Sequence, residues 1–170
     1  MERIGDLGQL CFKTAYLGLG SNRGDRERQL QRAISALERC GVVKSISKLY
    51  QTVPVLHPLM PIHGQSDFLN ACVALHTERE PQELLKQLLA IEVELGRYRG
   101  PLEIAWSPRA IDLDILAIDE QVLAEPELTI PHPRLHERRF VLEPLAEIAP
   151  QWRHPLFSKT AAELLDLLIS

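Results

Sequence analysis

Apolar and polar residues alternate in four stretches of the chain, and this period of two predicts β-strands. In the first stretch, which begins at Lys13, Ala15, Leu17 and Leu19 alternate with small or polar positions. We expect this strand to break in a turn at residues 18–22, Gly-Leu-Gly-Ser-Asn, because Gly and Asn tolerate unusual backbone dihedrals. The other predicted strands cover residues 42–52, 68–77 and 111–118.

Two further segments have apolar residues at helical spacing. Asp25 is placed to cap the first helix, which should run to about Cys40, with Gly41 ending it in the left-handed conformation. Pro81 suits the first turn of the second helix, and Gly96 is placed to end it. These elements alternate with the strands along the chain.

The resulting order, β-α-β-β-α-β, predicts an α+β fold with a ferredoxin-like core. Three C-terminal additions follow it: an edge hairpin at 121–130, a helical segment at 134–148 interrupted by Pro144, and a short helix at 160–168. Residues 1–12 lack a clear period, so we expect a flexible N-terminal extension. Residues 13–170 should then form a single domain.

Composition narrows the class of protein. The 170 residues are 45% hydrophobic and 25% charged, which is typical of a globular domain. A net charge of −4 argues against a partner such as nucleic acid or an anionic membrane. No apolar run approaches the roughly 20 residues of a spanning helix. With three cysteines far apart and no signal peptide, we expect a soluble, cytoplasmic protein with reduced thiols, acting as a monomer.

The segment 53–66 contains three prolines and no periodicity, which indicates a long loop of functional interest. It also carries His57 and His63. Because no third ligand lies near them in the sequence, we do not assign them a metal site.

Asp112 and Asp114 alternate with Leu113 on the last predicted strand of the core. Both carboxylates should therefore project to one side, roughly 6–7 Å apart, while Leu113 faces the core. Paired carboxylates suit a hard cation such as Mg²⁺, although a solvated strand face is the competing interpretation. Arg97, Arg99 and Arg109 precede this strand, and guanidinium groups bind phosphate, so a metal–phosphate site and a solvated face both stay open here.

Five motifs, in order, resemble those of one enzyme family. They are Pro108–Leu116 (PRAIDLDIL), Ala15–Asn22 (AYLGLGSN), Tyr50–Thr52 (YQT), Asp67–Asn70 (DFLN) and Ile130–Leu142 (IPHPRLHERRFVL). The chain is similar, from about residue 13 to 155, to 6-hydroxymethyl-7,8-dihydropterin pyrophosphokinases of the folate pathway. The resemblance implies that the hydroxyl of the pterin attacks the β-phosphorus of ATP and that AMP leaves.

The resemblance also implies a role for each matching residue. Asp112 and Asp114 would bridge two Mg²⁺ ions, with Asp112 also near the pterin. Thr52 and Asn70 would bind the edge of the pterin ring, and Phe68 and Phe140 would stack on its faces. The residues implied to contact ATP are Leu85, Glu92, Arg97, Trp106, Arg109, Ile115, His132 and Arg138, and the arginines implied to act in catalysis are Arg97, Arg99 and Arg109.

The chain departs from the family pattern at a few positions. Ala105 stands where the family usually has a basic residue, Ser107 where it has Gly, and Glu127 where some relatives have Arg. The loop at 53–66 is also longer than in compact relatives. These departures bear on kinetics and loop details more than on the class of reaction.

Two other classes of function share features with this sequence. A nucleotidyltransferase with a Gly-Ser turn generally has its paired aspartates soon after that turn, whereas Ser21 and Asp112 are about ninety residues apart here. A sheet that binds RNA by stacking needs exposed aromatic residues with basic flanks, whereas this chain is acidic and only 5% aromatic. Both therefore explain the sequence less well than a pyrophosphokinase.

Overall fold

The computed structural model describes residues 12–54, 66–97 and 109–169. Its main sheet has five strands, all paired antiparallel, in the order β2-β4-β1-β5 with β3 also on β4. The strands are β1 (Lys13–Ser21), β2 (Val42–Ile46), β3 (Tyr50–Thr52), β4 (Phe68–Thr77) and β5 (Asp112–Ile118). Apart from Phe12, the predicted extension at 1–12 lies outside the described residues.

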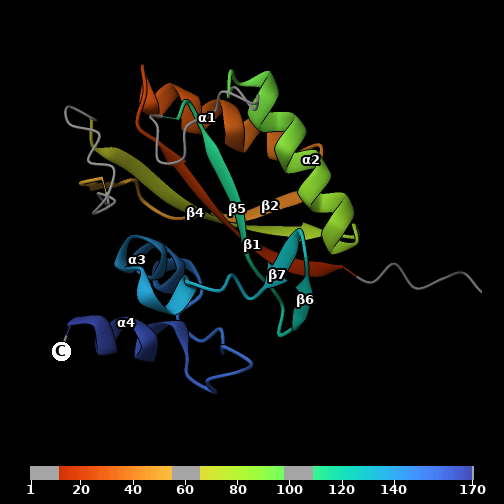
Figure 1. The fold of residues 1–170 in the computed structure, drawn as a ribbon, viewed down its shortest axis with the longest axis vertical. Coiled ribbons are helices and arrows are strands. Elements are labelled where there is room, and N and C mark those ends of the chain that lie inside the picture. Colours follow the sequence, from red (N-terminus) through yellow and green to blue (C-terminus); the bar gives the residue numbers. More distant parts are fainter. Residues whose placement is uncertain (1–11, 55–65, 98–108, 170) are drawn as a thin grey trace, which may run out of the picture.

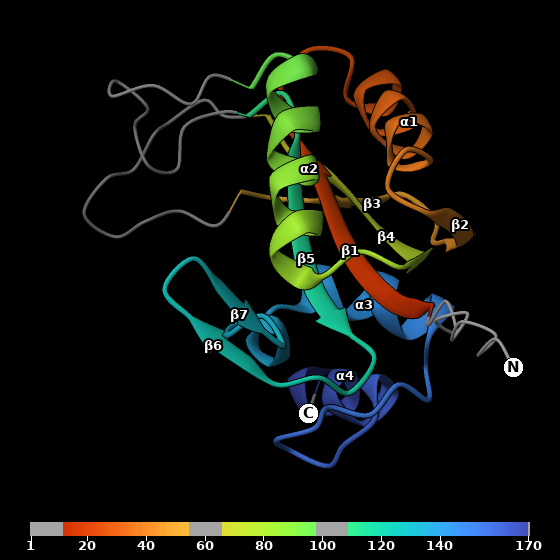
Figure 2. The ribbon, with the colours of Figure 1, turned by 90° about the vertical axis from the view of Figure 1, so that its right-hand side faces the viewer.

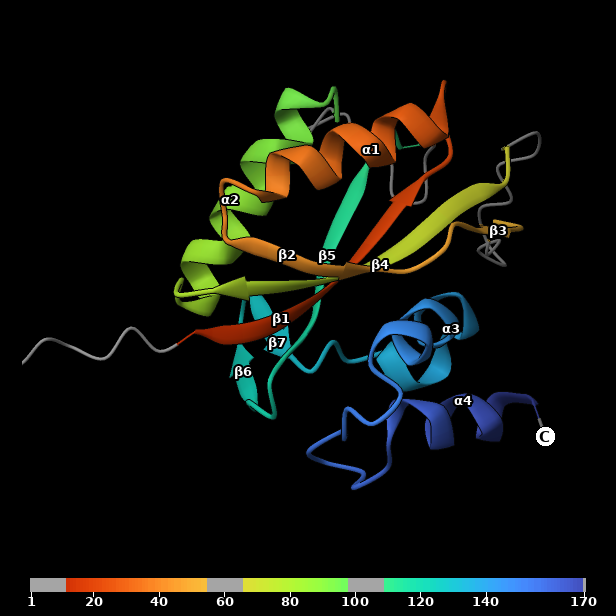
Figure 3. The same cartoon turned by 180° about the vertical axis from the view of Figure 1, so that it is seen from behind.

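Helices cover both faces of this sheet. On one face lie α1 (Arg26–Leu37) and α2 (Pro81–Glu94), and on the other lies α3 (Arg139–Ile148), with α4 (Ala161–Ile169) packed beneath it (Figure 1, and from behind in Figure 3). A 3₁₀ turn, η1 (Leu135–Glu137), precedes α3. The predicted α+β class is confirmed, and the predicted β-α-β-β-α-β order holds except that its second strand is divided into β2 and β3.

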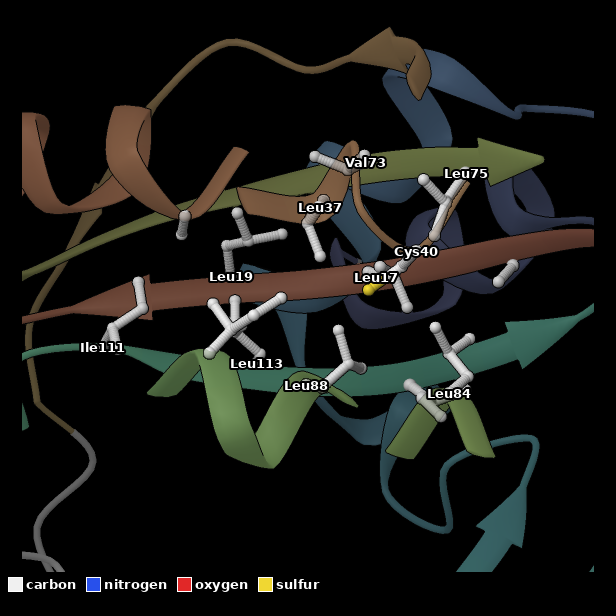
Figure 4. Packing of buried hydrophobic residues seen from close by; sticks show 14 of the residues in the cluster. Leu17, Leu19, Leu37, Cys40, Val73, Leu75, Leu84, Leu88, Ile111 and Leu113 are labelled. Carbon is white, nitrogen blue, oxygen red and sulfur yellow. The ribbon is translucent and has the colours of Figure 1, made fainter. Parts of the chain in front are cut away.

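The main core lies between the sheet and the pair α1 and α2. Leu17 and Leu19 of β1 meet Leu37 of α1 and Leu88 of α2 there, and all four are almost completely buried (Figure 4). Burying such a side chain stabilises the fold by roughly 1.5–3 kcal/mol each. The opposite face of the sheet has its own apolar cluster with α3 and α4, which leaves one end of that face free for polar residues.

Both predicted helices of the core are present, and three of the four residues predicted at their ends are confirmed, including Pro81 as the first residue of α2. Asp25 caps α1, since its side chain accepts a hydrogen bond of 3.1 Å from the Arg28 N–H. Gly96 follows α2 with a φ of 92°, which a side chain disfavours. The prediction for Gly41 was wrong, because α1 ends at Leu37 and Gly41 has no positive φ. A Cβ at Gly41 would lie 2.2 Å from the His76 carbonyl oxygen, so close packing on β4 explains this glycine.

The strand predicted at 42–52 is two strands, β2 and β3, which both pair with β4. The interruption falls at Ser47. Its hydroxyl oxygen accepts the Cys72 N–H at 2.9 Å and so takes a place that a backbone carbonyl would have in a continuous ladder. The chain can therefore bend there without leaving a buried donor unpaired.

The C-terminal additions are also present, but two predictions about them were wrong. Residues 121–130 form a hairpin, β6 (Leu123–Glu125) with β7 (Leu128–Ile130), but it is a separate two-stranded sheet beside the end of β5 and not part of the main sheet (Figure 2). Helix α3 runs through Pro144 without interruption. Proline removes one intrahelical bond, and the buried face of Val141, Leu142 and Leu145 offsets that cost. None of the described helices has the length and hydrophobicity that a membrane span requires.

Candidate active site

A cavity of about 580 Å³ opens on the α3 face of the sheet. Its floor is made by β1, β4 and β5, and its wall by the segment from Arg134 through α3 to Pro144. Among the predicted site residues, the structure brings eight to its lining: Thr52, Phe68, Asn70, Arg109, Asp112, Asp114, Arg138 and Phe140. These residues come from four separate segments, so the fold gathers most of the predicted set at one place.

The floor of the cavity follows the sheet register. Gly20 of β1 pairs with Asn70 on one side and with Asp112 on the other, and Gly18 pairs with Asp114. Because side chains alternate along a strand, these positions share one face. The two glycines leave the middle of that face bare: a Cβ on Gly20 would lie 3.1 Å from Asn70 Oδ1. The prediction that β1 breaks at Gly18 was therefore wrong, since both glycines are paired strand residues.

At the β4 side of the floor, two polar groups hold each other in place. The Asn70 Nδ2 donates a hydrogen bond of 2.7 Å to the Thr52 hydroxyl oxygen, and Asn70 is buried. Phe68 lies two residues before Asn70 on the same face, while Phe140 reaches the cavity from α3. An amide, a hydroxyl and two aromatic rings on opposite walls suit a flat, polar-edged heterocycle.

At the β5 side, both carboxylate oxygens of Asp112 accept bonds from arginines. Arg109 Nη1 donates to Oδ2 at 2.7 Å, and Arg97 Nη1 donates to Oδ1. Burial would raise the pKa of Asp112, but the charges and hydrogen bonds of Arg109 and Arg97 outweigh it and hold this pKa below its ordinary value. Asp112 is therefore a carboxylate in the folded protein.

Asp114 is in a different environment. Burial first, and then the negative charges of Asp112 and Glu92, raise the pKa of Asp114 from 3.8 to about 6, against the opposing charges of Arg138 and Arg109. Two neighbouring carboxyls with pKa values shifted in opposite directions are a pattern found at functional sites.

Glu92 is completely buried on α2, although an isolated glutamate on a helix is usually exposed. Its Oε1 accepts the Leu113 N–H at 2.7 Å, directly between the two aspartates, and also accepts a bond of 2.7 Å from Arg97 Nη1. Glu92 thus fixes the strand that carries Asp112 and Asp114 to the helix beside it. It does not line the cavity itself.

The start of β5 is also held by the end of β1. The Asn22 side-chain oxygen accepts the Arg109 N–H at 2.7 Å, the Asn22 N–H donates to the Arg109 carbonyl at 3.2 Å, and the Ser21 hydroxyl donates to the Ala110 carbonyl at 2.6 Å. The sequence pattern predicts Ser21 and Asn22 as turn residues. Their role is to position the backbone of Arg109 next to the aspartates.

The wall opposite the aspartates is basic. Arg138 lies 5.7 Å from the centre of the Phe140 ring, and burial together with the charge of Arg134 lowers the pKa of Arg138. His132 is partly buried beside them; burial, Arg138 and Arg134 lower its pKa. Its Nδ1 accepts the Arg134 N–H at 3.1 Å. Arg134 and Arg138 are therefore two like positive charges close together on this wall, which favours an anionic ligand.

Some predicted residues lie elsewhere. Leu85 and Ile115 pack in the core between the sheet and the helices α1 and α2, and neither side chain lines the cavity. Arg99 and Trp106 are outside the described residues, as are Ala105, Ser107, His57 and His63.

Sequence reasoning missed several lining residues, namely Gly18, Gly20, Leu116, Arg134, Arg139 and Pro144. For the glycines a signal existed, because two glycines spaced by two on a central strand leave a bare strip on one face. For the residues of α3 and the turn before it, the sequence offered no indication of which side faces the sheet.

The side chains of the cavity fit a Mg²⁺ site that the protein and a bound phosphate ligand form together. The described residues contain no cluster of three or more acidic, histidine or cysteine side chains that would hold a metal alone. Two neighbouring carboxylates on one face do fit an ion that takes one or two protein carboxylates and completes its shell with phosphate oxygens and water. Paired carboxylates facing a basic wall across one cavity are the parts of a phosphoryl-transfer enzyme.

Comparison with known proteins gives the family. Residues 16–150 match the sequence model of 7,8-dihydro-6-hydroxymethylpterin-pyrophosphokinase (HPPK). A 2-amino-4-hydroxy-6-hydroxymethyldihydropteridine pyrophosphokinase of Bacillus subtilis is 44% identical over 139 residues, 81% of this chain and 78% of that protein. One of Pseudomonas aeruginosa is 42% identical over 146 residues, 85% of each chain. The chain belongs to the HPPK family and is a pyrophosphokinase of folate biosynthesis.

Solved structures support the fold. The wild-type HPPK-DHPS of Plasmodium falciparum superposes with a TM-score of 0.71 at 17% identity, over 92% of this chain. This chain spans 45% of that longer protein. At such low identity the similarity concerns the architecture alone.

Proposed function

We propose that the protein transfers the pyrophosphoryl group of ATP to the hydroxyl of 6-hydroxymethyl-7,8-dihydropterin, and that this reaction takes place in the cavity. The hydroxyl oxygen bonds to the β-phosphorus, the bond from that phosphorus to the α-phosphate oxygen breaks, and AMP leaves. One observation carries this proposal: Asp112 and Asp114 face the same cavity as Phe68, Asn70 and Phe140. Groups suited to phosphate chemistry and groups suited to a flat heterocycle thus share one space.

The pterin would lie at the β4 side of the cavity. Phe68 and Phe140 line it from the sheet and from α3, where they can stack on the two faces of the ring. Asn70 and Thr52, already joined by their hydrogen bond of 2.7 Å, would bind the amino-oxo edge. This link orients the Asn70 amide before the ligand arrives, which lowers the entropy cost of binding.

The triphosphate would lie between the aspartates and the basic wall. Asp112 and Asp114 are the residues that would hold two Mg²⁺ ions, and when bound such ions neutralise charge on the transferring group. Arg109, beside Asp112, and Arg138, across the cavity, would bind phosphate oxygens, and His132 near Arg138 is proposed to do the same. We also propose Arg97 and Trp106 as ATP-binding residues, with Arg97, Arg99 and Arg109 acting in catalysis.

Five described residues proposed for the nucleotide are not part of the cavity lining, namely Leu85, Glu92, Arg97, Ile115 and His132. Glu92 acts on the site through Leu113 and Arg97 and is a positioning residue. Leu85 and Ile115 contribute to the core that supports β5. We also propose that residues 13–170 form one domain that works as a monomer, which sedimentation would test.

The identity of the nucleotide product tests the reaction. The protein is incubated with Mg-ATP, with and without the pterin, and the nucleotides are separated. AMP that forms only with the pterin, in equal amount to pterin diphosphate, is the expected result. ADP would indicate transfer of a single phosphoryl group, and release of pyrophosphate would indicate a nucleotidyltransferase. Either outcome would refute the proposal.

A further inference from the structure

Arg97 lies between two carboxylates from different elements. Its Nη1 donates to Glu92 Oε1 at 2.7 Å and also to Asp112 Oδ1. Only 8% of the Arg97 side chain is exposed, and the Glu92 side chain is not exposed at all. Ion pairs with so little exposure are weakly screened by solvent, so this guanidinium is a strong counterion for both acids.

Arg97 is anchored to Glu92 twice. Besides the side-chain pair, the Arg97 N–H donates to the Glu92 carbonyl oxygen at 2.9 Å. Glu92 is itself fixed to β5 through the Leu113 N–H. The guanidinium can therefore separate from Asp112 and still remain bonded to Glu92. It then stays close to both aspartates.

Any cation that binds Asp112 has to compete with guanidinium groups. Arg109 occupies Oδ2 and Arg97 occupies Oδ1. Arg109 is the more exposed of the two arginines, with 29% of its side chain accessible, and its partner Asp112 is its near neighbour in sequence. Arg97 is the more buried of the two arginines that compete with a cation for Asp112. It also has a second carboxylate partner, Glu92.

We propose that Arg97 is an exchangeable counterion for Asp112. In the free protein it neutralises Glu92 and Asp112 together and so weakens the binding of divalent cations. A cation held by Asp112 would displace Arg97 from this carboxylate, and the displaced guanidinium, still paired with Glu92, would bind a phosphate oxygen of the nucleotide. The exchange couples binding of the metal to binding of the nucleotide. This inference rests on the proposed role of Asp112 as a metal ligand.

The test uses Mn²⁺ alone, with binding to the nucleotide-free protein followed by electron paramagnetic resonance. Arg97→Met should bind Mn²⁺ about tenfold more tightly than wild type or better, because the competing charge is gone. Arg39→Met is the matched control: it removes the same charge from an exposed pair with Glu94 on α2 and should leave the affinity unchanged. Equal or weaker binding by Arg97→Met would overturn the proposal.

A second measurement uses the wild-type protein, so it does not depend on how the variant folds. Hydrogen exchange of the Arg97 guanidinium protons, observed by nuclear magnetic resonance, should be slow in the free protein and faster at saturating Mg²⁺ alone. Unchanged protection with the metal bound would refute the exchange. If wild type forms AMP while Arg97→Met leaves the metal affinity unaltered, only this inference fails. If wild type forms no AMP, the proposed function fails first.

Discussion

Asn70 on β4 and Asp112 on β5 both lie directly opposite Gly20 of β1, one on each side of it. The group proposed to recognise the pterin and the group proposed to hold the metal are thus separated by one strand. That strand has no side chain at this level. A bare central strand lets a flat ligand rest against the backbone and reach both neighbours.

Gly20→Ala should weaken pterin binding while leaving the fold intact. The added Cβ would lie 3.1 Å from Asn70 Oδ1 and 3.7 Å from Phe68 Cδ1, so the Asn70 amide must shift. We expect the KM for the pterin to rise about tenfold, which corresponds to 1.4 kcal/mol, and the KM for ATP to change little. Steady-state kinetics with each substrate varied in turn measure both constants.

Gly24→Ala is the control for that variant. Gly24 has a φ of 67° and no atom near its would-be Cβ. Alanine there should cost about 1 kcal/mol of folding free energy through backbone strain and leave the pterin KM unchanged. If Gly20→Ala binds the pterin as tightly as wild type, the cavity floor has been assigned to the wrong substrate.

Glu92→Ala should destabilise the protein strongly. It removes the acceptor of a buried N–H and a partner of Arg97, leaving a buried cation with fewer partners. Breaking a buried pair on one side costs about 3–5 kcal/mol. Glu94→Ala breaks an exposed pair on the same helix and should change the stability little by comparison. Urea denaturation of both variants gives the comparison. Equal losses would show that Glu92 does not position β5.

Asp114→Asn should stabilise the fold at neutral pH. Because the pKa of Asp114 is raised from 3.8 to about 6, the folded state binds its proton more tightly than the unfolded state. That favourable contribution is fully present below pH 3.8 and is lost as the pH rises through 6. Asparagine stays neutral, so at pH 7.5 the variant should be more stable by roughly 1–3 kcal/mol.

This gain should shrink as the pH falls from 6 to 4, where wild-type Asp114 is protonated as well. Denaturation in the presence of a chelator at several pH values measures the difference. A variant that is less stable than wild type at pH 7.5 would contradict the raised pKa.

The predictable part of the fold came from periodicity, which depends on burial alone. Leu17 and Leu19 identified β1, and Leu113 identified the core face of β5, because a strand buried on one side alternates its side chains. Glycine was less informative. The sequence predicts Gly18, Gly20 and Gly41 as residues that need unusual backbone dihedrals. In the structure each is a glycine because a neighbouring atom would lie close to a Cβ there. A sequence does not show which atoms are neighbours in space.

The same limit applies to the site. Asp112 and Asp114 were predictable as a pair on one face from their spacing of two residues, and the structure has them in one cavity. Glu92 is different, because its partner Leu113 lies 21 residues away and only the packing of α2 on β5 brings them together. The separation of the Asp112 and Asp114 pKa values likewise depends on which arginines reach each carboxylate.

Formation of AMP by aspartate variants tests most directly whether Asp112 and Asp114 carry the transfer. Wild type, Asp112→Asn and the control Glu94→Gln are compared at saturating Mg-ATP and pterin, with circular dichroism to confirm that each is folded. Loss of the metal carboxylate should lower the rate of AMP formation roughly a thousandfold or more in Asp112→Asn, while Glu94→Gln stays at the wild-type rate. A folded Asp112→Asn that forms AMP as fast as wild type would contradict the assignment of this site.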